Sequence, residues 1–118
     1  MKPDRVYLGH IRDAILDVDR YGSLGHDAFM AERMRQDAII RKLEIIGEAV
    51  KHLSDRAKDS CPEIPWKQIA GMRDRLTHDY FGVDLTLVWV VVEQELATLR
   101  IAIETLLSDD TARGDSGC

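Results

Sequence analysis

Residues 85–106, LTLVWVVVEQELATLRIAIETL, carry the strongest hydrophobic period in the chain. Apolar side chains recur there at alternating spacings of four and three, at Leu85, Trp89, Val92, Leu96, Leu99, Ile103 and Leu106. This spacing places them on one face of an α-helix, because a helix completes a turn about every 3.6 residues. Between Leu85 and Val92 the segment is apolar on nearly every side. We therefore predict a central helix, or one that also packs against a second subunit.

Two long helices are predicted ahead of this stretch. They span about residues 5–21 and about residues 27–56, and each has an apolar stripe at helical spacing. The stripes are Leu8, Ile11, Ile15 and Val18 in the first helix, and Ile39, Leu43, Ile46, Val50 and Leu53 in the second. Gly47 lies inside the second helix, where glycine costs about 1 kcal/mol relative to alanine. We attribute Gly47 to the close approach of a neighbouring helix.

One more helix is predicted between these two and the last. It begins at Trp66, behind Pro65, which suits a helix start because the first N–H groups of a helix have no partner within it. It ends at about His78 or Tyr80, because residues 81–83 break the pattern.

The chain is therefore predicted to be all-α, an antiparallel bundle of four to five helices with short loops. A length of 118 residues fits one domain, and the contents of 45% hydrophobic and 31% charged residues are ordinary for a globular protein. We expect the folded domain to cover residues 1–107, and residues 108–118 to form a polar, disordered tail.

Charge is unevenly distributed along the chain, whose formal net charge is −5. Residues 1–78 contain 14 Lys and Arg against 13 Asp and Glu, which is a net charge of +1. Residues 79–118 contain 2 against 8, which is a net charge of −6. A polyanion such as a nucleic acid would have to bind the first two-thirds of the chain, at a local patch.

The lack of a targeting signal and the small number of cysteines favour a cytoplasmic protein. The sequence has no apolar run near 20 residues and no signal-peptide pattern, which argues against a membrane or secreted protein. Its two cysteines, Cys61 and Cys118, are too few for a disulfide framework. We therefore expect a reducing cytosol as the compartment.

The pattern of the predicted helix after Pro65 is interrupted by a charge. Its apolar stripe consists of Trp66, Ile69, Leu76 and Tyr80, and Arg73 occupies the middle of the same face. Burying an unpaired guanidinium is very costly, so Arg73 must meet a carboxylate, a partner chain or a wet cleft.

A structural ion pair with Glu44 or Glu48 is the simplest explanation of Arg73.

His78 would lie about 140° from Arg73 around an ideal helix. The two side chains converge only if the helix distorts before residues 81–83, or if two subunits contribute to one site.

Other candidate sites are weak. His10, His26 and His52 have no partner at metal-ligand spacing, and the sequence contains no glycine-rich phosphate loop and no nucleophile elbow. We therefore predict neither a metal nor a cofactor.

A basic cluster in the second helix is either a solvated face or part of a phosphate-binding surface. It consists of Arg33, Arg35, Arg41 and Lys42.

Residues 73–80, RDRLTHDY, match the R-x4-H-x-Y motif of the HepT-like toxins, a branch of the HEPN superfamily of ribonucleases. Three flanking blocks resemble that branch in the same order. They are residues 43–49 (LEIIGEA), residues 62–66 (PEIPW) and residues 80–84 (YFGVD), the last followed by Val88 and Trp89. The resemblance covers residues 6–107, nearly the whole predicted domain.

The resemblance implies a HEPN-like, all-helical homodimer whose two motif helices face each other across a cleft. It also implies metal-independent RNA cleavage by a toxin whose antitoxin is a minimal nucleotidyltransferase. Carried over to this chain, the catalytic residues are Arg73 and His78, supported by Asp74, and the antitoxin silences the toxin by adenylylating Tyr80. The chain departs from the family pattern at Asp74, where many relatives have asparagine, and at Asp79, where many have glycine.

Two other classes of function remain open from the sequence. In the first, the chain is a non-catalytic HEPN module that binds a nucleotidyltransferase partner, and Arg73 is an interfacial anchor. The acidic net charge is compatible with this class. In the second, the chain is a helical scaffold without a ligand.

Overall fold

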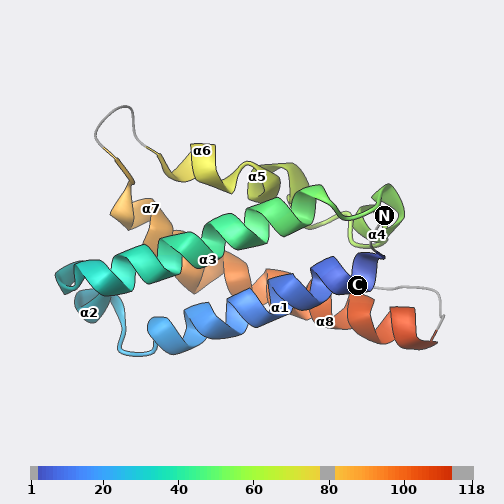
Figure 1. Cartoon of the computed structure of the whole chain (residues 1–118), viewed down its shortest axis with the longest axis horizontal. Helices are drawn as coiled ribbons and strands as arrows, with labels where there is room; N and C mark the ends of the chain where they lie inside the picture. Colours follow the sequence, from blue (N-terminus) through green and yellow to red (C-terminus); the bar gives the residue numbers. More distant parts are fainter. Residues whose placement is uncertain (1–2, 78–81, 113–118) are drawn as a thin grey trace.

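Three long helices form the body of the protein and lie side by side along its length (Figure 1). The computed structural model describes residues 3–77 and 82–112, with side chains to residue 108. Its elements are α1 (Asp4–Tyr21), α2 (His26–Ala31), α3 (Arg33–Lys51), α4 (Asp55–Ser60), α5 (Trp66–Ala70), α6 (Met72–Leu76), α7 (Leu85–Val90), the π-helical turn η1 (Val91–Glu95) and α8 (Leu96–Ala112). The chain runs along α1 in the direction opposite to α3 and α8, which confirms the all-α antiparallel bundle. The last helix continues past the predicted domain boundary at residue 107.

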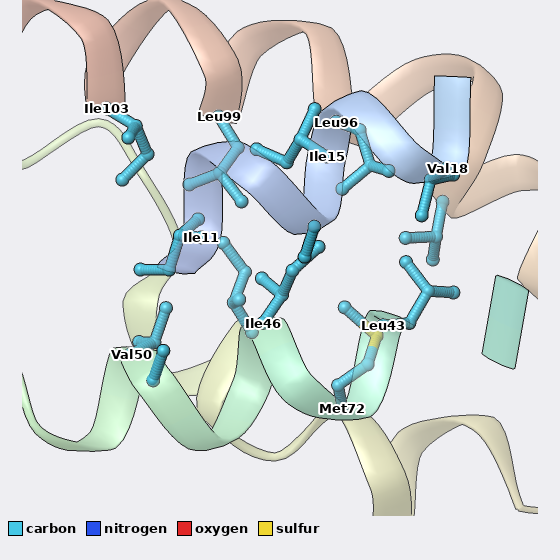
Figure 2. Close-up of a cluster of buried hydrophobic side chains, with 14 of the residues drawn as sticks. Ile11, Ile15, Val18, Leu43, Ile46, Val50, Met72, Leu96, Leu99 and Ile103 are labelled. Atoms are coloured by element: carbon cyan, nitrogen blue, oxygen red, sulfur yellow. The ribbon is translucent and has the colours of Figure 1, made fainter. Parts of the chain in front are cut away.

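The core lies where the three long helices meet (Figure 2). Every member of the two predicted stripes in α1 and α3 that Figure 2 labels is buried, including Ile15 and Ile46. Met72 of α6 completes the core from the other side of α3. In the part of the chain that the structure describes, no buried residue is polar or charged. No helix in that part is both long and apolar enough to cross a bilayer.

The prediction of one continuous helix over residues 27–56 is wrong. Glu32 has an extended backbone (φ −127°, ψ 111°) and separates α2 from α3. The Gln36 side chain stabilises this break by donating hydrogen bonds to the carbonyls of Phe29 (2.9 Å) and Met30 (3.1 Å). Side chains thus satisfy carbonyls that a continuous helix would satisfy through its own backbone.

A second break follows α3, which ends at Lys51. Ser54 caps α4, because its side chain accepts a hydrogen bond from the Ala57 N–H (3.1 Å). The Asp4 carboxylate of α1 accepts hydrogen bonds from the Ser54 backbone N–H (2.9 Å) and hydroxyl (2.6 Å). The start of α1 is thereby tied to the turn between α3 and α4.

The last helix also differs from its prediction, because it contains a π-helical turn. Val88 is buried ahead of this turn, Val91 at its first position and Leu96 directly after it, so the buried residues are spaced by three and then by five. A π turn accommodates one extra residue and so shifts the buried face. The predicted stripe members Trp89 and Val92 are consequently half-buried rather than central.

The interior glycine of α3 marks a close helix contact, as predicted. A Cβ added to Gly47 would lie 2.8 Å from the Ile69 carbonyl oxygen and 3.2 Å from Met72 Cβ. A real Cβ does not approach a carbonyl oxygen that closely, so α3 would have to move away from α5 and α6.

We expect the Gly47→Ala substitution to lower the free energy of unfolding by about 1–3 kcal/mol, because it overpacks this contact. Gly9→Ala in α1 is the matched control, since a Cβ there meets nothing within 4 Å. We expect Gly9→Ala to raise stability by up to about 1 kcal/mol through helix propensity. Urea denaturation followed by circular dichroism measures both changes. Equal stabilisation by the two substitutions would show that α3 and α5 are not in close contact.

Candidate active site

The segment predicted as one helix after Pro65 is two short helices. Gly71 (φ −88°, ψ 20°) separates α5 from α6, and Thr77 is extended (φ −81°, ψ 135°). The prediction that the helix continues to His78 or Tyr80 is therefore wrong at Thr77, while His78 and Tyr80 themselves lie outside the described residues.

The kink at Gly71 changes the environment of Arg73. Trp66, Ile69 and Leu76 are buried, as predicted, but Met72 also lies in the core, with an exposed fraction of 1%. Arg73 is exposed. The expectation that Arg73 stands within the core face is therefore wrong, because α6 is rotated relative to a continuation of α5.

Arg73 lines an open groove of about 660 Å³ between α3 and the α5–α6 segment. One wall consists of Arg41, Glu44, Gly47, Glu48 and Lys51 of α3. The other wall consists of Ala70, Gly71, Arg73, Asp74 and Thr77. Gly47 allows the two walls to meet closely at the base, so the same residue that packs the helices also shapes the groove.

Carboxylates neutralise two of the three cations in this groove. Arg41 Nη1 lies 3.8 Å from Glu44 Oε1, and Lys51 Nζ lies 3.0 Å from Glu48 Oε1. The pKa of the Glu48 carboxyl lies below its ordinary value, chiefly because Lys51 donates a hydrogen bond to it, with smaller attractions from His52 and Arg73. The groove is thus a mixed-charge surface rather than a uniformly basic one.

Arg73 has no such partner among the described residues. Its side chain makes no hydrogen bond or ion pair there, so the ion pair considered with Glu44 or Glu48 does not form. Its effect on the pKa of Glu48 is a weak attraction, smaller than those of Lys51 and His52. Arg73 therefore lines the groove with a guanidinium that no described residue pairs, and such a group suits a bidentate oxyanion ligand such as a phosphate.

The two ends of the segment that carries His78 and Tyr80 are held together. Thr77 and Val83 form an isolated antiparallel β-bridge, and the Asp84 N–H donates a hydrogen bond to the Leu76 carbonyl (2.8 Å). The Thr77 hydroxyl also donates a hydrogen bond to the Arg73 carbonyl (2.8 Å). Because Thr77 lines the groove, the chain leaves α6 at the groove's edge.

A second arginine of the motif anchors α6 on another side. Arg75 Nη1 donates a hydrogen bond to Glu95 Oε1 (2.8 Å), and Nη2 donates one to Oε2 (2.5 Å). The hydrogen bond with Glu95 raises the pKa of Arg75 above its ordinary value. The sequence does not predict this pair, because 20 residues separate its members and no sequence period marks the π turn that carries Glu95.

The basic cluster of α3 does not form one surface. Lys42 Nζ lies 3.0 Å from Asp17 Oδ2, and its hydrogen bond lowers the pKa of that carboxyl. Arg35 donates a hydrogen bond to the Tyr21 carbonyl (2.6 Å). Arg41 alone of the four lines the groove. Within the described ranges, no three His, Cys, Asp or Glu side chains are grouped as a metal site would require.

Comparisons with known proteins show the family of this chain. The family described as "Ribonuclease HepT-like" matches residues 11–106, and the chain belongs to this family. The resemblance drawn from residues 73–80 and their flanking blocks is therefore confirmed.

Several relatives carry ribonuclease names. A protein named "Probable ribonuclease HepT" in Thermococcus cleftensis is 40% identical over 85% of this chain and 92% of its own length. A protein named as a putative RNase in Caldanaerobacter subterraneus subsp. tengcongensis is 36% identical over 93% of this chain and 99% of its own. A Methanocaldococcus jannaschii protein, named as a gamma-glutamylcyclotransferase and putative RNase, is 39% identical over 92% of this chain, which spans 49% of that protein. No solved structure shows a significant match.

Proposed function

We propose that this protein is a metal-independent endoribonuclease, the toxin of a toxin–antitoxin pair. The observation that carries the proposal is Arg73, which is exposed in a groove and has no partner among the described residues, five residues before His78 in the motif of a ribonuclease family. The ribonuclease names of the relatives support the same activity. In this proposal Arg73 and His78 are catalytic, and Asp74, which lines the groove beside Arg73, has a supporting role.

RNA supplies its own nucleophile, so this reaction needs no metal. The ribose 2′-OH attacks the adjacent phosphorus, forming a 2′-O–P bond while the P–O5′ bond breaks. The proton of the 2′-OH leaves to a base, and the departing 5′-oxygen takes up a proton. His78 is suited to this exchange, because histidine has a reference pKa near 6.5. Its contribution is expected to be roughly 10²–10⁴-fold in rate.

Arg73 supplies charge stabilisation in the same step. Negative charge builds up on the non-bridging phosphate oxygens in the transition state, and a guanidinium can donate two parallel hydrogen bonds to them. The products are a 2′,3′-cyclic phosphate and a 5′-hydroxyl.

We propose that a second copy of the chain completes the site. In a homodimer with twofold symmetry, the two motif segments meet near the axis and line one cleft. The apolar side chains of Leu85, Trp89 and Val92 are half-buried against the edge of the core, and their exposed parts are compatible with such packing.

A minimal nucleotidyltransferase antitoxin is the proposed regulator, and Tyr80 is its target. Transfer of AMP from ATP to the Tyr80 hydroxyl, with release of pyrophosphate, would place an anion in the motif, where it competes with the RNA phosphate for Arg73. The proposal locates the pair in the cytoplasm, where cellular RNA and ATP are available.

The products of cleavage test the proposed chemistry. We expect a defined RNA oligonucleotide to yield a 2′,3′-cyclic phosphate and a 5′-hydroxyl, both identified by mass spectrometry. An oligonucleotide of the same sequence with 2′-O-methyl groups should remain intact, because it has no 2′-OH nucleophile. Cleavage of the methylated strand, or direct release of a 3′-phosphate by water, would contradict the mechanism.

A further inference from the structure

The π turn determines where Glu95 lies. In a regular α-helix, spacings of three and four would place residue 95 on the same face as Val88 and Val91, both of which are buried. The extra residue of η1 instead brings Leu96 into the core, with an exposed fraction of 2%. Glu95 is thereby moved to the edge of the core, where 28% of its side chain is exposed.

Glu95 meets Arg75 at that edge, and the pair links η1 to α6. Both carboxylate oxygens accept hydrogen bonds from the two terminal nitrogens of one guanidinium. Such a bidentate pair fixes orientation as well as distance. The Arg75 side chain is 26% exposed, so the pair is partly shielded from water.

This contact holds α6 together with the core packing of Met72 and Leu76. Met72 packs into the core on one side of α6, and Arg75 is held by Glu95 on another. Arg73 precedes Arg75 by two residues, which is about 200° around a helix. Its side chain therefore projects from the side of α6 that faces away from Glu95. That side is the groove.

We propose that Glu95 is a positioning residue for the motif, which acts through Arg75 to direct Arg73 into the groove and to fix the point where the chain leaves α6 at Thr77. The inference rests on the proposed ribonuclease function. It adds Glu95 to the candidate site, a residue outside the motif and 17 positions after His78 in the sequence. A π turn is rare and occurs frequently at functional sites, which agrees with this role.

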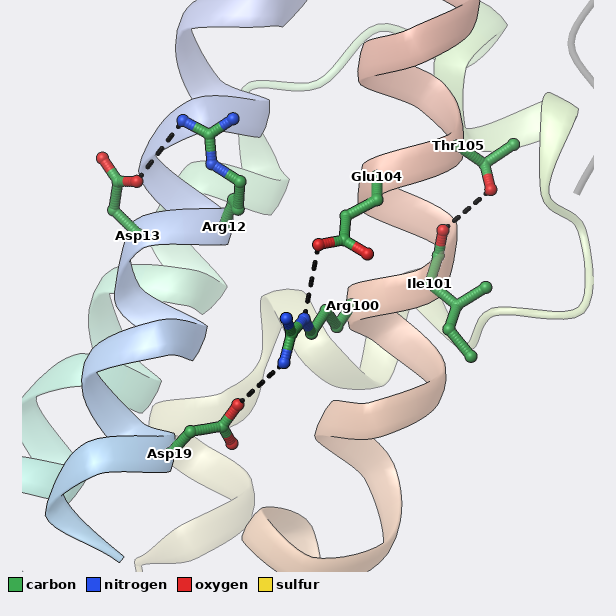
Figure 3. Close-up of polar contacts among 7 residues, drawn as sticks. All are labelled: Arg12, Asp13, Asp19, Arg100, Ile101, Glu104 and Thr105. Atoms are coloured by element: carbon green, nitrogen blue, oxygen red, sulfur yellow. Dashed lines mark hydrogen bonds and ion pairs between the residues drawn. The ribbon is translucent and has the colours of Figure 1, made fainter. Parts of the chain in front are cut away.

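The chain offers a matched control on the same continuous helix. Glu104 of α8 also forms an ion pair, since its Oε2 lies 3.3 Å from Arg100 Nε. Figure 3 shows this pair on the α1–α8 face, where Arg100 also contacts Asp19. Glu104→Gln therefore removes the charge of one carboxylate that pairs with an arginine on this helix, and it leaves the contacts of α6 unchanged.

The experiment compares Glu95→Gln and Glu104→Gln with the parent protein, in full-length chains assayed on a defined RNA oligonucleotide. We expect Glu95→Gln to lower kcat by about tenfold to a hundredfold, because small displacements of catalytic groups have effects of this size. KM should change little. Glu95→Asp should recover part of the loss, and Arg75→Gln combined with Glu95→Gln should add little to either single substitution. Glu104→Gln should match the parent.

Hydrogen exchange of the backbone amides of residues 72–77 gives a second readout that does not depend on activity. We expect faster exchange there in Glu95→Gln than in the parent or in Glu104→Gln. If the parent cleaves RNA and folded Glu95→Gln retains its kcat, the inference is overturned while the proposed function stands. If the parent fails to cleave, the proposed function fails. Separately, if Glu95→Gln exchanges residues 72–77 at the same rate as the parent, the positioning role is overturned.

Discussion

Replacing Arg73 with alanine is expected to lower the rate of RNA cleavage by about 10²–10³-fold, the usual cost of removing one donor that stabilises a developing anion. The side chain is exposed and has no partner among the described residues, so stability should change by no more than about 0.5 kcal/mol. Single-turnover cleavage of a defined RNA, with thermal unfolding of the same samples, measures both effects.

The matched control for Arg73→Ala is Arg33→Ala. Arg33 is an exposed arginine that pairs at 3.8 Å with Asp37 on α3 and does not line the groove. We expect Arg33→Ala to cleave at the parent rate. An equal loss in both variants would indicate that Arg73 contributes only general positive charge. Parent activity in Arg73→Ala would exclude it from catalysis.

Replacing Tyr80 with phenylalanine is expected to abolish silencing by a nucleotidyltransferase antitoxin while most of the cleavage is kept. The substitution removes only the hydroxyl that would accept AMP, and neither the proposed proton transfer nor the phosphate contact uses that hydroxyl. The test incubates parent and variant with the nucleotidyltransferase and ATP, then measures intact mass and RNA cleavage.

Tyr7→Phe is the control for that experiment, because Tyr7 lies on α1, where it stacks on His52 with ring centroids 4.9 Å apart. Tyr7→Phe should be modified and silenced as the parent is. Silencing of Tyr80→Phe to the same extent as the parent would show that the switch is not Tyr80.

Periodicity predicted the parts of the fold that depend on one regular helix packing against another. The stripes of α1 and α3 are buried as predicted, because uninterrupted 3.6-residue periods admit one arrangement around a core. The close contact at Gly47 was also predictable, since an interior glycine is unfavourable unless a neighbour needs the space.

The interruptions of the helices were not predictable, because tertiary contacts produce them. The break at Glu32 depends on Gln36 reaching the carbonyls of α2, and nothing in the local sequence requires it. The π turn places Val91 and Leu96 in the core at a spacing of five, although the sequence also offers a regular stripe through Val92. Both patterns are apolar, and packing decides between them.

The sequence predicts which residues form the candidate site, but it does not predict their surroundings. The mismatch of Arg73 with its apolar neighbours singled out a residue that lines the groove, and the kink at Gly71 takes Arg73 off the core face. The roles of His78 and Tyr80 remain predictions from the motif, since both lie outside the described residues. The Arg75–Glu95 contact required the fold, because only the π turn brings these side chains together.

Cleavage of total cellular RNA by the purified full-length chain in EDTA tests the central claim most directly. Intact mass first establishes that the protein carries no adenylyl group, and His78→Ala, checked for folding, serves as the inactive reference. We predict that the parent degrades RNA with chelator present and that His78→Ala is slower by roughly 10²–10⁴-fold. Folded, unmodified parent that leaves all RNA intact would contradict the claim and favour a non-catalytic module that binds a nucleotidyltransferase.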